Sequence, residues 1–383
     1  SRLAMDPLEF RHRNYLRRGQ ALPNGQLMQG PVLLAESAHQ AWQALEDTSP
    51  IVRTGAQKIG RGISANFSGY GVPGNSAACA LEMQRDGNVI VSLGVCDLGG
   101  GQRSTVAQIV AGVLDLPLAR ITLRTADTAV TPLVGATAGS KTLYHSSQVA
   151  SLVATALRKR LLQLAATMLE VREDDLLLCD GRIEGRGWPG KGVTLEEVLA
   201  EAAARGVDLK EQAVFQTPRA EKFSSASGSG IDWLDFTFGA HAAEVAVDED
   251  TGEVTLLKYA CCHDVGRAIH PQSVAGQMQG GVAQGLGFSL MEQVTIANGQ
   301  IQTPSLREYL IPTALDLPDI STIILESGEG LGAFGNRGIG EPPAAASAGA
   351  IANAIYDAVG VRITELPITA ERVFQALQRR STS

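Results

Sequence analysis

Hydrophobic and polar positions along the chain follow two patterns, which predict β-hairpins and helices in turn. Apolar residues alternate over 77–84 and 89–95 on either side of an Asp86-Gly87 turn, and this pattern predicts a β-hairpin. A second hairpin is predicted at 238–247 and 253–262. Helical spacing predicts helices at 6–18, 33–46, 102–116, 148–169, 271–290, 344–359 and 370–379, and short apolar runs predict strands at 121–124 and 320–325.

The predicted elements form two lobes that a polar segment separates. The polar segment begins near residue 206 and contains the Ser/Gly run 224–230, a composition typical of a mobile connection. The predicted division is a helical tail of a preceding domain at 1–55, a first lobe at 56–215, a linker at 216–235 and a second lobe with the C-terminal helices at 236–383.

Composition narrows the class of protein. The net charge is −8, aromatic residues make up 5% of the chain and no basic tract is present, which argues against a nucleic-acid partner. No apolar stretch is long enough to cross a bilayer. The five cysteines form no CxxC pair, so we expect reduced thiols in the cytoplasm rather than a zinc site or a disulfide framework. The chain starts without Met, in a helix capped by Asp6, and we therefore expect a processed, split or truncated chain.

A glycine-rich run at 328–340 is the most informative segment of the sequence. It contains Gly330-x-Gly332-x-x-Gly335 after a predicted strand, but the Pro342-Pro343 pair and the nearby chain end are incompatible with a Rossmann unit. Glu341 lies between Gly340 and these two prolines, where a rigid backbone would fix the direction of its carboxylate. Glu341 is either a positioned base or an ordinary acid at a helix N-terminus. Arg337 either holds an anion or is a solvated charge.

Further glycine loops open predicted helices at 97–105 and 138–142. Their backbone N–H groups, their hydroxyls and Lys141 would suit phosphate or another polar ligand. Neither loop has the spacing of a nucleotide-hydrolysing P-loop. The segment 276–285 is also rich in glycine, and its glutamines could hydrogen-bond a heterocycle. These loops together with one rigid carboxylate suggest a large, polar cofactor.

The histidines offer weaker evidence for chemistry. His241, His263 and His270 have neither the HExxH spacing nor another zinc pattern, so a structural role is favoured over a metal site. A His263-Asp264 pair could belong to a hydrolase triad, but the sequence has no GxSxG nucleophile elbow. The residues therefore do not favour a hydrolase.

The ordered motifs resemble the xanthine dehydrogenase and aldehyde oxidoreductase family, in particular the C-terminal half of its molybdopterin-binding large subunit. The resemblance implies an α+β fold, a two-lobed molybdenum-cofactor-binding domain whose mixed sheets have helices packed on one face. The residues that carry the resemblance are Asp6-Pro-Leu-Glu-Phe-Arg, Phe238-Gly-Ala-His-Ala-Ala-Glu-Val, His263-Asp-Val-Gly-Arg-Ala-Ile-His-Pro, Gly276-Gln-Met-Gln-Gly-Gly-Val-Ala-Gln-Gly, Tyr309-Leu-Ile-Pro-Thr and Gly338-Ile-Gly-Glu-Pro-Pro.

The resemblance also implies roles for individual residues. Glu341 matches the catalytic base of the family, while Gln277 and Gly340 match residues beside the cofactor. The molybdenum is held by the pterin in this family and by no direct protein ligand. The loops that match cofactor-binding loops are Gly99, Gly100, Gly101 and Gln102 in one, and Gly139, Ser140, Lys141 and Thr142 in the other.

One position departs from the family pattern. The first loop usually reads Gly-Gln-Gly, whereas this chain has Gly100 at the glutamine position and Gln102 two residues later. Either Gln102 substitutes from a shifted backbone, or one cofactor contact is lost.

The function implied by the resemblance is oxidative hydroxylation of an aldehyde or an N-heterocycle such as a purine, with oxygen derived from water. The cofactor expected is molybdopterin, in its cytosine dinucleotide form in bacteria. The chain has no clustered cysteines for iron, so [2Fe-2S] clusters and FAD are expected on partner chains, namely an iron–sulfur subunit and a flavin subunit. The N-terminal half of the molybdopterin subunit is a further expected partner, within a higher oligomer. The alternative is a non-catalytic structural or cofactor-enclosing half, and the substrate stays open.

Overall fold

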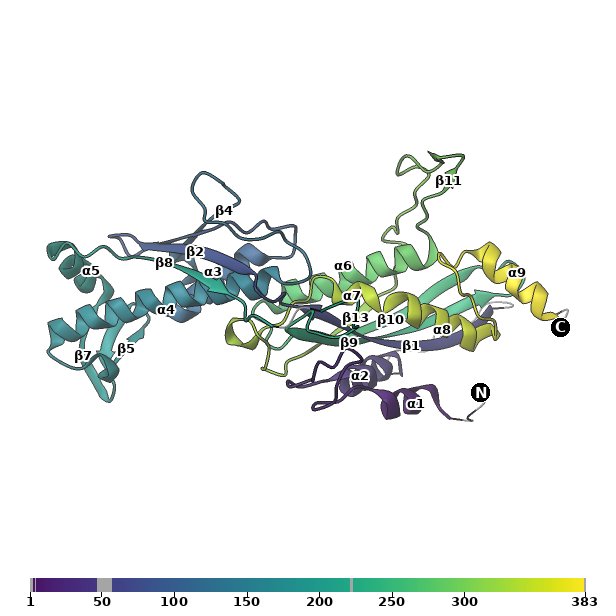
Figure 1. The fold of residues 1–383 in the computed structure, drawn as a ribbon, viewed down its shortest axis with the longest axis horizontal. Helices are drawn as coiled ribbons and strands as arrows, with labels where there is room; N and C mark the ends of the chain where they lie inside the picture. Colours follow the sequence, from purple (N-terminus) through teal and green to yellow (C-terminus); the bar gives the residue numbers. More distant parts are fainter. Residues whose placement is uncertain (1–2, 4, 47–56, 221–222, 382–383) are drawn as a thin grey trace. The chain divides into compact units, whose positions relative to one another are not determined.

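The computed structural model describes residues 3, 5–46, 57–220 and 223–381, which form two compact units (Figure 1). Unit 1 comprises residues 1–69, 235–329 and 339–383. Unit 2 comprises residues 70–234 and 330–338. The chain therefore passes from unit 1 to unit 2 and back twice.

Unit 1 is built on a four-stranded sheet with the order β1-β9-β10-β13. The second predicted hairpin is confirmed, because β9 (Asp235–Asp248) and β10 (Val254–Asp264) pair antiparallel. Strand β13 (Ile320–Leu325) pairs parallel with β10, and β1 (Gln57–Tyr70) lies beside β9. Nearly every residue of β9 is buried, as expected for a central strand that is covered on both faces.

Helices cover both faces of this sheet. Helices α6 (Pro271–Leu290) and α8 (Ser347–Val359) share one apolar core with Val245 and Cys261. Helix α2 (Leu34–Glu46) packs on the other face, against Ala242, Ala260 and Cys262. The remaining elements of unit 1 are α1 (Pro7–Asn14), α7 (Pro342–Ala345), α9 (Ala370–Ser381), β11 (Ile296–Ala297) and β12 (Gln300–Ile301).

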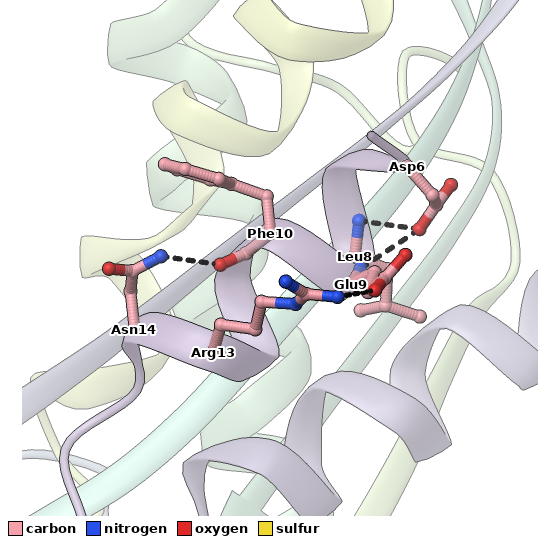
Figure 2. A network of polar contacts seen from close by, with 6 residues as sticks. All are labelled: Asp6, Leu8, Glu9, Phe10, Arg13 and Asn14. Carbon is pink, nitrogen blue, oxygen red and sulfur yellow. Dashed lines mark hydrogen bonds and ion pairs between the residues drawn. The ribbon is translucent and has the colours of Figure 1, made fainter. Parts of the chain in front are cut away.

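Helix α1 begins as its sequence predicts and ends early. The Oδ1 atom of Asp6 accepts hydrogen bonds from the backbone N–H groups of Leu8 and Glu9, each at 2.9 Å (Figure 2). Pro7 occupies the first turn, where a missing N–H costs nothing. Tyr15 is already extended, so the helix ends at Asn14 rather than near residue 18.

Unit 2 is built on a second four-stranded sheet, with the order β4-β3-β2-β8. The first predicted hairpin is confirmed, because β2 (Ser76–Met83) and β3 (Val89–Leu93) pair antiparallel. Helices α3 (Gln102–Leu114) and α4 (Thr142–Leu169) cover the face of alternating buried residues. The other elements are β4 (Ile121–Thr125), α5 (Leu195–Ala204), β8 (Lys210–Gln216), the antiparallel sheet β5 (Leu176–Cys179), β6 (Arg182–Gly185), β7 (Trp188–Thr194), and the 3₁₀ turns Leu118–Arg120, Glu173–Asp175 and Ala333–Gly335.

The observed division differs from the predicted one. Strand β1 belongs to the sheet of unit 1 and not to the first lobe, because it lies beside β9. The polar stretch from about residue 206 contains strand β8, which pairs with β2. The predicted boundary between residues 55 and 56, and part of the linker at 221–222, lie outside the described residues.

Helix α4 starts at Thr142, six residues before the predicted start at Gln148. Its first turns are rich in serine and threonine, which have low helix propensity. They are nevertheless helical because Tyr144, Ser146 and Ser147 are buried. Tertiary packing therefore overrides local propensity at this end of the helix.

Glycines on one face of α6 allow the next helices to approach closely. A methyl group at Gly281 would lie 2.6 Å from Cβ of Pro343, and one at Gly285 would lie 2.2 Å from Oγ of Ser347. Gly281 and Gly285 are four residues apart and therefore share a face. Gly281 lies against Pro343, and Gly285, one turn later, lies against Ser347. The helix α6 and the segment 342–347 therefore run in the same direction.

Two histidines lie in the core of unit 1. The Nε2 atoms of His241 and His263 are 2.9 Å apart, and Nδ1 of His241 is 2.8 Å from the Tyr259 hydroxyl. Both imidazoles are fully buried. Burial lowers the pKa of His263 to about 3, and burial together with the neighbouring His263 holds the pKa of His241 well below its ordinary value. Both side chains are therefore neutral near pH 7.

We predict that Gly281→Ala destabilises the chain by about 1–3 kcal/mol, because the added methyl overlaps Pro343. Gly280→Ala is the matched control. A methyl at Gly280 meets nothing within 4 Å, and alanine favours a helix interior by up to about 1 kcal/mol. Urea unfolding of the two variants measures the difference, and equal stability would contradict the close helix approach.

We predict that the free energy of unfolding decreases as the pH falls below about 6.5. The unfolded chain protonates both histidines near that pH, whereas the native pKa values lie well below it. Stability is therefore complete above pH 6.5, and each histidine removes roughly 1 kcal/mol per pH unit below pH 6.

Urea titrations at several pH values test this dependence. His263→Gln should be less stable at pH 7 and should depend less on pH. His39→Gln, at an exposed position of α2, should keep the pH dependence of the wild-type chain. An unchanged slope in His263→Gln would contradict the prediction.

Candidate functional site

The first glycine loop of unit 2 is filled by a carboxylate of the chain itself. Asp97 accepts hydrogen bonds from the backbone N–H groups of Gly99 at 3.0 Å, Gly101 at 3.2 Å and Arg103 at 3.1 Å. These three amides are therefore already bonded within the loop, and its predicted contact with phosphate or another polar ligand stays a prediction. Sequence reasoning missed the role of Asp97, although aspartate before glycines is a known signal for side-chain bonds to nearby backbone.

Gln102 of this loop has a side-chain oxygen that could still accept a hydrogen bond. It is the first residue of α3, and its Oε1 atom is buried without a hydrogen-bond partner in the described structure. Gly100, at the position of the family glutamine, has no side chain to offer. These observations favour Gln102 over Gly100 as a ligand contact.

The second glycine loop leads into the N-terminus of α4. Gly139 has a φ of +58°, and a methyl there would lie 2.9 Å from the Trp233 indole, so glycine is required. Lys141 occupies the N-cap position, and its side chain makes no capping hydrogen bond. The Thr142 hydroxyl oxygen is buried without a partner among the described residues. The first N–H groups of a helix have no partners within it and carry partial positive charge, so this end suits an anion.

The two loops and the glycine-rich run at 330–338 lie together in unit 2. The Thr137 hydroxyl donates to the Cys96 carbonyl at 3.2 Å and thereby joins the loops. A methyl at Gly338 would lie 2.0 Å from the Ser140 carbonyl oxygen, so the run passes directly against the second loop. The second loop therefore contacts both the first loop, at Cys96, and the glycine-rich run, at Gly338.

The glycines of that run serve its own fold. Methyl groups at Gly330 and Gly332 would lie 2.3 Å and 2.2 Å from atoms of Asn336. Asn336 and the backbone N–H of Ala333 also bond Ser147 of α4, at 3.3 Å and 3.1 Å. The Gly-x-Gly-x-x-Gly spacing thus reflects a compact turn rather than a dinucleotide site.

Two buried charged or titratable residues accompany these loops. Arg337 is only 1% exposed, so the interpretation as a solvated charge is wrong. His145 lies in the first turn of α4, and burial, with a smaller contribution from Lys141, lowers its pKa to about 4. Its Nε2 atom is buried without a partner in the described structure. No sequence pattern singled out His145, because a histidine in a helix carries no positional signal.

Unit 1 holds the other predicted residues. Glu341 is the exposed N-cap of α7, and the buried Pro342 and Pro343 follow it. The Glu341 carbonyl accepts a hydrogen bond from the N–H of Ala344 at 3.1 Å. The hydrogen bond and the two buried prolines therefore fix the backbone position of Glu341.

Gln277 lies on the same side as Glu341. It is half-buried and precedes Gly281 by one helical turn, on the face of α6 that contacts the segment 342–347. Because α6 and that segment run in the same direction, Gln277 and the exposed Gly340 lie at the same end. Unit 1 thus combines a rigid carboxylate with an amide that can bond a heterocycle.

The candidate metal ligands do not form a cluster. The described part of the chain contains no group of three or more His, Cys, Asp or Glu side chains arranged to hold a metal ion. His270 caps α6 by accepting a hydrogen bond from the N–H of Ser273 at 3.2 Å. All five cysteines are free thiols. Within the described ranges, no helix combines the length and the hydropathy needed to cross a bilayer.

Comparisons with known proteins give relatives of one kind. The chain is 28% identical to the xanthine dehydrogenase molybdenum-binding subunit of Escherichia coli O157:H7, over 97% of this chain and 50% of the relative. It is 30% identical to the nicotine 6-hydroxylase large subunit of Paenarthrobacter nicotinovorans, over 77% of this chain and 36% of the relative. The crystal structure of quinoline 2-oxidoreductase from Pseudomonas putida 86 superposes with a TM-score of 0.85 at 26% identity, covering 98% of this chain and 50% of that one.

The chain thus spans half or less of the length of these relatives. The molybdopterin cofactor-binding domain matches residues 35–318, which include both glycine loops and α6. The match covers most of the sequence, and it agrees with the fold and with the open N-terminus of α4. The chain belongs to the molybdopterin cofactor-binding domain family of the xanthine dehydrogenase and aldehyde oxidoreductase type.

Proposed function

We propose that this chain is the molybdopterin-binding portion of a molybdenum hydroxylase, with Glu341 as its catalytic base. The observation that carries the proposal is the placement of Glu341. It is an exposed carboxylate on two buried prolines that pack against glycines of α6. A general base needs a defined position and access to the proton it removes, and the fixed backbone and exposure of Glu341 support that role.

The polar groups of unit 2 fit a large anionic cofactor. Buried oxygens of Gln102 and Thr142 have no partner in the described structure, and such atoms are costly unless a ligand bonds them. Lys141 adds positive charge at the N-terminus of α4. We assign Gly139, Ser140, Lys141 and Thr142 to the phosphate and pterin groups.

The remaining predicted residues complete the assignment. Gln277 can bond the pterin through its amide, and Gly340 leaves room beside the reacting groups because it has no side chain. We assign the first-loop contact to Gln102, with Gly99, Gly100 and Gly101 allowing close backbone approach.

The reaction we propose is oxidative hydroxylation of an aldehyde or an N-heterocycle. When bound, the cofactor would supply a molybdenum centre that accepts two electrons and a proton from the C–H bond of the substrate that breaks. The Glu341 carboxylate takes the proton of the water-derived hydroxyl as its oxygen attacks the substrate carbon. The prolines and α6 hold the carboxylate in place during this transfer.

We further propose the cytosine dinucleotide form of the cofactor and a cytoplasmic complex. The relatives named above are called subunits and have longer chains, which supports partners. The partners would be the other half of the molybdopterin subunit, a [2Fe-2S] subunit and an FAD subunit. Free cysteines throughout the chain are compatible with a reducing compartment.

The alternative, a half that only encloses the cofactor, is favoured by the first loop. Asp97 occupies amides that a ligand could otherwise use, and Gly100 lacks the family glutamine side chain. The two proposals differ in what Glu341 does, so substitution of Glu341 separates them.

We predict that Glu341→Gln lowers kcat of the assembled enzyme by roughly 10²–10⁴-fold, because an amide cannot accept the proton. Molybdenum content, measured by elemental analysis, should not change. Glu371→Gln is the control, since Glu371 is an exposed acid in the first turn of α9. Full activity of Glu341→Gln would leave the enclosing role as the better proposal.

We predict that Lys141→Ala weakens retention of the cofactor by roughly tenfold, because a charged hydrogen bond to phosphate is lost. Pterin fluorescence and molybdenum content of the purified protein measure retention. Lys159→Ala removes an exposed lysine further along the same helix and should retain the cofactor. Equal loss in both variants would indicate a general charge effect.

A further inference from the structure

Asn66 of strand β1 bonds the backbone directly after Glu341. Its Nδ2 group donates a hydrogen bond to the Pro342 carbonyl at 3.0 Å, across 276 positions of the sequence. Both residues belong to unit 1. A carbonyl oxygen has two lone pairs, so Asn66 can bond it without removing it from the helix.

Two successive prolines limit the hydrogen bonds that the backbone at the start of α7 can donate. Pro342 and Pro343 have no backbone N–H, so neither residue can donate a hydrogen bond to its surroundings. Their carbonyl oxygens can still accept hydrogen bonds. The Asn66 amide is a donor from outside the helix, and it fixes the Pro342–Pro343 peptide, whose carbonyl it bonds.

Packing on α6 fixes the segment from a different side. Pro343 lies over Gly281, and Ser347 lies over Gly285. Contact of this kind limits the distance of α7 from α6, but it does not select a direction for the Pro342–Pro343 peptide. The hydrogen bond from Asn66 supplies that direction, because hydrogen bonds weaken steeply as their angle changes.

The oxygen of the Asn66 side-chain amide has no hydrogen-bond partner in the described structure. This atom, Oδ1, is buried. A buried unbonded acceptor costs roughly 1–3 kcal/mol, so asparagine is not the most stable choice at this position. An unsatisfied buried polar atom calls for an explanation, and a functional role is one.

We infer that Asn66 is a positioning residue that aims the Glu341 carboxylate by holding the Pro342 carbonyl. The inference rests on the proposed role of Glu341 as the base. Asn66 touches neither substrate nor cofactor in this assignment, and it acts through the peptide that it bonds.

A matched control exists on the same strand. Asn353 of α8 donates from its Nδ2 group to the carbonyl of Ile63, also at 3.0 Å. This bond joins β1 to α8 with the same chemistry and does not involve the peptide after Glu341. Asn66→Ala and Asn353→Ala each remove a 3.0 Å bond from an asparagine amide to a backbone carbonyl, and Asn353→Ala also removes the acceptor of a 3.4 Å bond from Arg362.

The first experiment measures hydrogen exchange of the full chain by mass spectrometry, without cofactor. Asn66→Ala should increase exchange in the peptide that covers residues 339–346, whereas Asn353→Ala should leave that peptide protected. If Asn66→Ala does not fold, Asn66→Asp keeps the size of the side chain and removes the donor. Wild-type protection in the Asn66 variants would overturn the inference.

The second experiment measures kcat and KM of the assembled enzyme. Asn66→Ala should lower kcat by roughly 10–100-fold, as expected for a misplaced base, and leave KM unchanged. In the Glu341→Gln background the same substitution should have no further effect on kcat, because there is no base to aim. A merely structural role would lower the activity of both backgrounds by the same factor.

The outcomes separate this inference from the proposed function. If Glu341→Gln is fully active, the proposed function fails, whatever the exchange data show. If Glu341→Gln is inactive and Asn66→Ala keeps the wild-type kcat, the proposed function stands and the positioning role of Asn66 is overturned.

Discussion

The close approach of α6 to the segment 342–347 is the constraint on which the candidate site of unit 1 depends. Glycine at 281 and 285 leaves room for Pro343 and Ser347 to lie directly on the helix. A side chain at either glycine would push the segment outward and would move Glu341 with it. The place of the carboxylate is thus set by apolar packing several residues away, while the carboxylate itself stays exposed. A general base benefits from such a defined position.

Unit 2 uses two helix N-termini in opposite ways. At α3, Asp97 neutralises the first backbone N–H groups, so the loop is rigid before any ligand arrives. At α4, Lys141 makes no capping bond and Thr142 keeps a buried hydroxyl without a described partner. An anionic ligand would compete with an existing carboxylate at the first helix, whereas at the second it would meet Lys141 and the first backbone N–H groups of α4. This asymmetry explains why similar glycine loops have different roles in the proposed site.

Local residue patterns predicted the helices and strands well. They did not predict strand placement or burial, which depend on contacts between residues far apart in sequence. The bounds of α6 and β13 agree with the residue patterns, because periodicity and turn residues are local signals. The placement of β1 beside β9 joins residues far apart in sequence, so the predicted first lobe began too early. The burial of Arg337 and the hydrogen bond from Asn66 to Pro342 also depend on contacts between residues far apart in sequence. The motifs led to the proposals for Glu341 and the loops, and a local sequence signal could have found Asp97. The burial of His145 and the bond from Asn66 required coordinates.

The two prolines after Glu341 explain why a distant asparagine belongs to the site. Proline fixes φ and so stiffens the start of α7, but it also removes the N–H groups that usually tie a helix start to its surroundings. A stiff backbone that donates few hydrogen bonds has a defined shape, but these bonds alone do not fix its orientation. The glycine face of α6 restricts that orientation in one direction, and the Asn66 amide restricts it in another. The stiffness supplied by the prolines is therefore useful to Glu341 only because residues from β1 and α6 orient the segment that carries it.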